Sequence, residues 1–141
     1  MIIQSIKTLC IGRCSAVFGD RVCRGCHRFH EEIVDWNGYD DARQARTWER
    51  LEAMVIAAMT LRIDLFDTEA LRSQLQQRKI RLIAHHSPYC WAYCLLRVGA
   101  PSIRRVEAYG FSLKPAYEQR TIVEIRDEID GELHERAEAQ L

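Results

Sequence analysis

Four cysteines near the start of the chain form two close pairs. Three residues separate Cys10 from Cys14, eight residues follow Cys14, and two residues separate Cys23 from Cys26. Thiolates two or three residues apart can bind one ion at roughly 2.3 Å, while a longer loop returns the chain so that a second pair completes a tetrahedron. The spacing therefore predicts one metal ion or small iron–sulfur cluster held by Cys10, Cys14, Cys23 and Cys26.

Glycines and arginines around these cysteines suit the same site. Gly12 and Gly25 lie inside the two pairs, where a missing β-carbon lets the backbone turn and direct N–H groups at sulfur. The Gly19-Asp20 sequence provides a turn between the pairs. Four thiolates around a divalent zinc or an oxidised two-iron cluster leave a charge of roughly −2. We expect nearby basic side chains to offset it: Arg13, Arg21, Arg24 and Arg28.

Zinc is the favoured occupant of this site, and an iron–sulfur cluster is the alternative. The cysteine spacing differs from both the bacterial and the plant-type ferredoxin patterns. A last ligand that leads directly into a helix suits a closed zinc knuckle. Four cysteine ligands leave no open position for a substrate on zinc, so the site predicts a structural role and not hydrolysis.

The residues around the cysteines resemble a known family. The segments Cys-Ile-Gly-Arg-Cys, Cys-Arg-Gly-Cys-His-Arg and Glu-Glu-Ile-Val-Asp-Trp, within residues 8–51, are similar to the YdhL-like family of unknown function (DUF 1289). The resemblance implies a small bacterial protein with four cysteine ligands, of a kind described as a predicted iron–sulfur protein. That family commonly has Gly-Arg after the last cysteine, whereas this chain has His27-Arg28, so His27 is a candidate extra or replacement ligand.

A second group of metal-binding residue types lies further along the chain. Cys90 and Cys94 are one helical turn apart, and His85 and His86 precede them. The group can bind a metal in principle. Free cysteines are among the most buried residue types, however, and aromatic residues surround these two. We therefore favour a packed core helix with the histidines at its N-terminal entrance.

The elements that position the four cysteines are predicted to be a short helix and then a longer one. Phe29, Ile33 and Trp36 recur at helical spacing, and Asn37-Gly38 ends that pattern. Asp40 can cap the next helix, in which Glu49 and Glu52 face solvent. The inward side of this helix is predicted to be Ala45, Trp48, Leu51, Val55, Ala58 and Met59.

Three more elements are predicted before residue 110. Asp67 or Thr68 caps a helix that carries Leu71 and Leu75 on one face, and Ile80 to Ile83 alternates like a strand. Ser87-Pro88 opens a further helix that ends at Gly99. Its two adjoining stripes are Tyr89, Tyr93 and Leu96, and Cys90, Cys94 and Val98.

The pattern of residues 117–130 fits either a helix or a strand. Val123 and Ile125 alternate like a strand, while Ile125 and Ile129 fit a helical face, and we expect a strand-like start and a helical tail. The predicted fold is mainly α with a minor β component, a small α+β class. A cysteine-rich metal-binding head, residues 1–38, precedes a mainly helical body, residues 39–141, and packs with it as one unit.

Charge and hydropathy narrow the classes of partner. The 20 basic and 20 acidic residues give zero formal charge, so no global field attracts nucleic acid or anionic lipid. The longest apolar run, Ala53 to Leu61, falls short of the roughly 20 residues that span a bilayer. We expect a cytoplasmic protein without membrane contact, in which thiols stay reduced and available to a metal.

Three functions compete on these observations. The favoured one is a non-catalytic accessory protein whose metal stabilises a small head and whose body binds a protein partner. We expect no enzyme activity, because phosphate-binding loops, nucleophile elbows and paired-histidine helix motifs are all missing from the sequence. The second is an iron–sulfur protein that transfers electrons or senses oxidation. The third is a nucleic-acid-binding zinc knuckle that uses the basic head, with Phe18 or Phe29 stacking on bases.

Overall fold

The chain is mainly helical with a minor β component, as predicted, in a computed structural model that describes residues 21–23, 26–80 and 86–141. The helices are α1 (His30–Val34), α2 (Asp41–Thr60), α3 (Thr68–Gln77), α4 (Pro88–Gly99) and α5 (Ile122–Glu138). The strands are β1 (Ile63–Leu65) and β2 (Phe111–Leu113), and four short 3-10 turns, η2 (Trp36–Gly38), η3 (Ala100–Ser102), η4 (Val106–Tyr109) and η5 (Pro115–Tyr117), connect elements.

Local capping explains where the main helices begin. The side chain of Asp40 accepts a hydrogen bond from the Arg43 backbone N–H, and that of Asp67 accepts one from Ala70. Ser87 caps α4 and is followed by proline at the first helical position. A side-chain acceptor at this position satisfies an N–H group that has no partner within the helix. The three predicted starts are confirmed, because each depends only on neighbours in the sequence.

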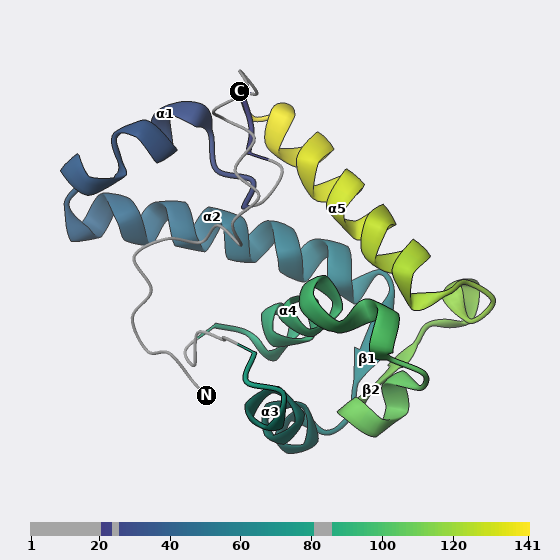
Figure 1. The fold of residues 1–141 in the computed structure, drawn as a ribbon. Helices are drawn as coiled ribbons and strands as arrows, with labels where there is room; N and C mark the ends of the chain where they lie inside the picture. The colour runs from purple at the N-terminus through teal and green to yellow at the C-terminus, as the bar shows by residue number, and fades with distance from the viewer. Residues whose placement is uncertain (1–20, 24–25, 81–85) are drawn as a thin grey trace.

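Helix α2 is the centre of the molecule. It packs against α4 and α5, while α3 packs against α4. Figure 1 shows α1 at the N-terminal end of α2 and the two strands near its other end, with α5 on one side and α3 and α4 on another. The core between these helices is formed by fully buried side chains that include Met59, Leu71, Leu75, Leu95, Leu96, Phe111, Ile125, Ile129 and Leu133.

The two strands come from segments far apart in the sequence. Ile63 pairs with Leu113 and Leu65 pairs with Phe111. Neither segment was predicted as a strand, because three residues are too few to show an alternating pattern. The strand predicted from Ile80 falls mostly on residues 81–83, which lie outside the described residues. Ile80 itself is buried and is not part of a strand.

Two details of the predicted helices are wrong. Residues 122–138 form one continuous helix, so the strand-like start at Val123 does not exist. The helix prevails because Thr121 and Glu124 form a reciprocal capping box and Ile125, Ile129 and Leu133 are buried at helical spacing. Ala45, predicted to face inward, is exposed, because the neighbouring elements do not cover that side of α2.

Two glycines allow a matched test of the backbone. Gly110 has a φ of +87°, and a β-carbon there would clash with the carbonyl oxygen of Asp67. Gly131 lies inside α5, where a β-carbon meets nothing. We expect Gly110→Ala to lower the free energy of unfolding by more than about 2 kcal/mol. Gly131→Ala should raise it by about 0.5 to 1 kcal/mol, because alanine favours a helix over glycine.

Urea unfolding followed by circular dichroism measures both effects. The Gly131→Ala variant controls for the added methyl group, since it makes the same chemical change at a site with space. Equal stability of the Gly110→Ala variant and the wild type would contradict the close approach of residues 67 and 110.

Candidate functional site

The chain turns back on itself between Cys23 and Arg28. The Cys23 N–H donates to the Arg28 carbonyl at 2.9 Å, and the His27 N–H donates to the Cys23 carbonyl at 2.7 Å. Val22 and Phe29 form an antiparallel bridge on the outer side of this turn. Cys23 lies at the base of this turn, opposite Arg28, and Cys26 lies within the turn. Both are buried, at 0% and 5% exposed.

The two sulfur atoms are neighbours and have a basic group beside them. A hydrogen bond with the side chain of Cys23 and burial raise the pKa of the Cys26 thiol, while Arg28 acts in the opposite direction. The Arg28 Nε donates to the Cys26 Sγ at 3.2 Å, and its guanidinium lies 4.9 Å from the centroid of the Trp36 ring. This arrangement can hold two thiolates against one cation, with an arginine to offset part of their charge.

His27 adopts the left-handed conformation that the turn requires. Its φ is +65°, a value that glycine adopts more readily than any other residue. The buried imidazole donates to the main-chain carbonyl of Asp130, and its ring centroid lies 6.5 Å from that of His134. These contacts attach the turn to α5.

The protonation state of His27 follows from its surroundings. Burial first, and then the electrostatic effect of the nearby Arg97 and His134, lower the pKa of His27 to about 4. The imidazole is therefore neutral at pH 7. The described contacts of His27 are with α5, so this residue helps to join the turn to the body. A ligand role for His27 stays a prediction.

Glu32 joins α1 to α2 behind the cysteine turn. Its carboxylate accepts two hydrogen bonds from the Arg50 guanidinium, at 2.6 and 2.7 Å, and one from the Thr47 hydroxyl at 3.1 Å. It also accepts from the Phe29 N–H at 2.8 Å, next to the turn. No pattern in the sequence predicted this pairing, because the glutamate and the arginine are 18 residues apart and charged helix faces usually point to solvent.

Cys10 and Cys14 lie outside the described residues. The prediction that they complete the site with Cys23 and Cys26 therefore stays a prediction. The boundary between head and body at residue 38 also stays one. Several described residues before this boundary contact the body. Val22 lies in the core, His27 contacts α5, and Glu32 accepts hydrogen bonds from α2.

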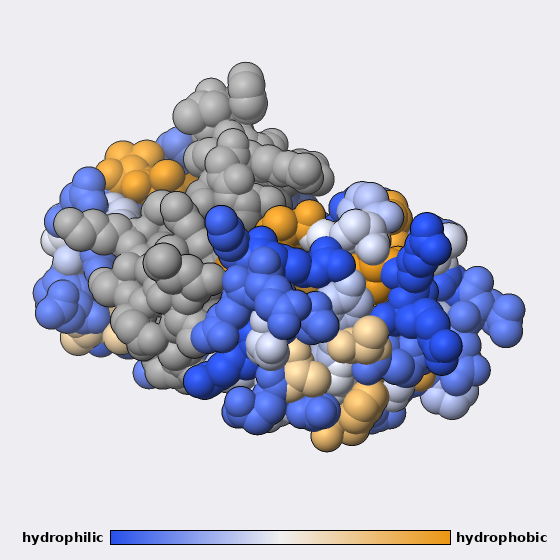
Figure 2. Space-filling model, turned by 60° about the horizontal axis from the view of Figure 1, so that its bottom comes forward, coloured by the Kyte–Doolittle hydropathy of each residue, from blue (hydrophilic) through white to orange (hydrophobic). Residues whose placement is uncertain are grey.

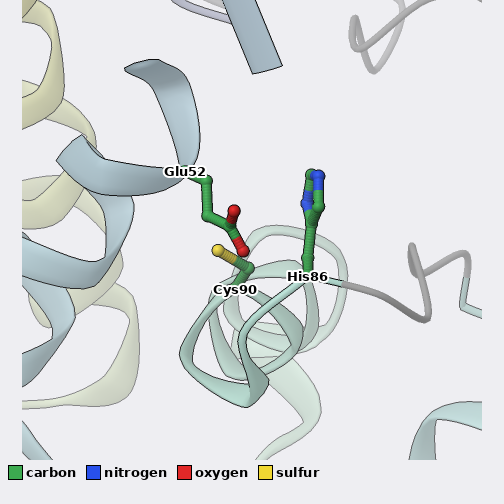
Figure 3. A group of neighbouring side chains, drawn as sticks. All are labelled: Glu52, His86 and Cys90. Carbon is green, nitrogen blue, oxygen red and sulfur yellow. The ribbon is translucent and has the colours of Figure 1, made fainter. Parts of the chain in front are cut away.

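A second group of ligand-type side chains lies between α2 and α4. Glu52 extends from α2 toward the start of α4, where His86 precedes the helix and Cys90 lies in its first turn (Figure 3). One ligand atom of each residue lies within 4.8 Å of the others. The Ser87 N–H donates to the Glu52 Oε2 at 2.7 Å. The structure thus brings together two residues that the sequence singled out and one that it did not.

The prediction that Glu52 faces solvent is wrong. Its side chain is half-buried, because the start of α4 packs over this side of α2. Helix α4 is a core helix, as predicted, and buries Cys90, Trp91 and Tyr93. Burial, and then the charges of Glu52 and Cys94, raise the pKa of Cys90. His85 lies outside the described residues, and Cys94 is partly buried against the core.

The described surface shows scattered apolar residues. On the face in Figure 2, hydrophilic residues predominate and hydrophobic ones form separate areas. The large exposed hydrophobic residues come from five separate places in the chain: Val34, Leu61, Phe66, Val98 and Leu141. Single exposed apolar residues are normal on soluble domains and do not identify a partner. Among the helices of the described residues, none is long and apolar enough to cross a membrane.

Comparison with known proteins gives one finding. A family model described as "Protein of unknown function (DUF1289)" matches residues 10–54, which are 45 of the 141 residues. The matched part contains the four cysteines together with Glu32, and ends within α2. The finding supports the resemblance to a family of unknown function. No curated protein matches the chain, and no solved structure does.

Proposed function

We propose that this chain is a non-catalytic accessory protein whose N-terminal head binds one zinc ion through Cys10, Cys14, Cys23 and Cys26. The observation that carries the proposal is the tight turn that buries Cys23 and Cys26 with their sulfur atoms side by side. A pair of cysteines separated by two residues in such a turn can supply two of the four ligands of a tetrahedral four-thiolate site. The metal would stabilise the head, and the helical body would bind a protein partner.

The contacts around the turn support a structural role for the metal. Arg28 reaches a cysteine sulfur, and Glu32 bonds both the end of the turn and α2. Through His27 the same turn contacts α5. An ion at the cysteines would therefore stabilise residues that two helices of the body also hold, because metal binding free energy adds to folding free energy.

An iron–sulfur cluster is the second candidate for the same ligands. The N–H···S hydrogen bond from Arg28 to Cys26 is compatible with it, since hydrogen bonds to sulfur are among the factors that set the potential of a cluster. With a cluster, the protein would transfer electrons or sense oxidation. The donor set suits both occupants, so the choice between them needs a direct measurement.

The described residues give less support to a nucleic-acid-binding function. Arg28 is buried at 3% exposed and lies between Cys26 and Trp36. Phe29 packs against the core under the guanidinium of Arg50, whose carbon lies 4.2 Å from the ring centroid. A buried arginine and a covered ring are poor choices for contacting phosphates and stacking on bases.

Metal analysis of protein purified without oxygen tests the proposal. We expect colourless protein with zinc bound to the N-terminal cysteines and no labile sulfide. A brown protein with iron, sulfide and a visible absorption that reductant bleaches would overturn zinc in favour of the cluster. Protein that folds normally yet retains neither metal in the N-terminal site, even after reconstitution with each, would overturn both.

A further inference from the structure

The space between α2 and the start of α4 holds three different kinds of metal ligand in one place. Glu52 offers a carboxylate, His86 an imidazole and Cys90 a thiol, with their ligand atoms within 4.8 Å of one another. We propose that these three residues form a second metal site, which binds a zinc-class divalent ion independently of the four N-terminal cysteines.

The mixture of ligands identifies the class of ion. Thiolate and imidazole favour zinc and its neighbours in the transition series over magnesium and calcium, which prefer oxygen ligands. A carboxylate and a thiolate together carry two negative charges, which a divalent ion balances in this half-buried place. Sulfur, nitrogen and oxygen ligands of tetrahedral zinc lie about 3.5 Å apart, from their usual bond lengths.

Small side-chain movements can bring the ligand atoms, now within 4.8 Å of one another, to the roughly 3.5 Å spacing of a zinc site. Cys90 is buried at 7% exposed, while Glu52 and His86 are only half-buried. A shift of roughly 1 Å in the two less buried side chains would therefore bring the three ligand atoms to bonding positions around one ion.

Neighbouring groups already orient two of the ligands. The Ser87 N–H fixes one carboxylate oxygen of Glu52 at 2.7 Å, which leaves the other oxygen for an ion. The ring of Trp48 packs edge-on against His86, with centroids 5.4 Å apart. Such outer contacts hold metal ligands in place and contribute to metal affinity. Three protein ligands leave a fourth position for water or an exogenous ligand, unlike a four-cysteine site.

Zinc stoichiometry in matched variants tests this site. The purified chain is equilibrated with zinc, freed of unbound ion and analysed for zinc per chain. We expect Cys90→Ala to lose one equivalent, and Cys94→Ala, which removes a thiol one turn along the same helix, to lose none. Glu52→Gln should lower the zinc affinity of this second site by more than about 100-fold. Glu49→Gln, on the exposed side of α2, should leave that affinity unchanged.

Further variants test the two sites separately and show whether a loss of zinc is caused by misfolding. Cys26→Ser removes a ligand of the N-terminal site only, so the equivalent that depends on Cys90 should remain. His86→Asn changes a half-buried residue and should lose the same equivalent as Cys90→Ala while the helical circular dichroism stays intact. Zinc content equal to that of the wild type in folded Cys90→Ala and His86→Asn variants would overturn the second site and leave the first untouched.

Discussion

Replacing Cys26 by serine is expected to weaken zinc binding at the N-terminal site by about 100-fold or more. Structural zinc sites bind with roughly 10 to 16 kcal/mol, so one ligand of four contributes about 3 kcal/mol, or about two powers of ten. The same change also removes the sulfur that accepts the hydrogen bond from Arg28. Competition with a chromophoric chelator measures the loss as the disappearance of the tightest binding phase.

Cys94→Ser is the matched control for this experiment. It removes a thiol that belongs to neither proposed site, so the tightest phase should stay as in the wild type. The helices of the body should persist in both variants, because all of their core except Val22 comes from residues between the start of α2 and the end of α5. Unchanged tight zinc binding in a folded Cys26→Ser variant would exclude this cysteine as a ligand.

Glu32→Ala is expected to lower the free energy of unfolding by about 2 to 3 kcal/mol. The change leaves the Arg50 guanidinium without two hydrogen bonds and leaves the Thr47 hydroxyl and the Phe29 N–H without this acceptor. Breaking a buried ion pair by removing one partner costs about 3 to 5 kcal/mol, and we lower that range because the Arg50 side chain is 24% exposed. Urea unfolding of the zinc-loaded protein measures the difference.

Glu31→Ala supplies the comparison for that measurement. Glu31 is the exposed acid beside Glu32 in the first turn of α1, so its loss should cost only a few tenths of a kcal/mol. If the free energy of unfolding fell by the same small amount in both variants, Glu32 would not hold α1 to α2.

The same carboxylate gives stability a defined pH dependence. Burial alone would raise the pKa of Glu32, but hydrogen bonds from Arg50, Phe29 and Thr47, with the charge of Arg50, hold it below the ordinary 4.5. The contribution is therefore present above about pH 4.5 and is lost as the pH falls through the folded-state pKa. Glu32→Gln removes this titration, so its stability deficit relative to the wild type should shrink in acid.

Local patterns in the sequence predicted the helical framework well. Asp40, Asp67 and Ser87 begin helices where expected, because a cap depends on a side chain and an N–H group only two or three residues apart. The helix over residues 122–138 was misjudged at its start. There the buried Ile125 fits both an alternating and a helical pattern, and the Thr121–Glu124 capping box together with packing on α2 and α4 distinguishes them.

The spacing of the cysteines identified the head as a candidate metal centre from the sequence alone. Residues 23 and 26 then lie together, as close spacing in a tight turn requires. Only the tertiary structure could pair Glu32 with Arg50, add Glu52 to His86 and Cys90, and join residues 63–65 to 111–113. These contacts form only when the chain folds and distant segments pack together. A periodic pattern in the sequence reports on neighbouring residues, so it cannot predict contacts between residues far apart in the chain.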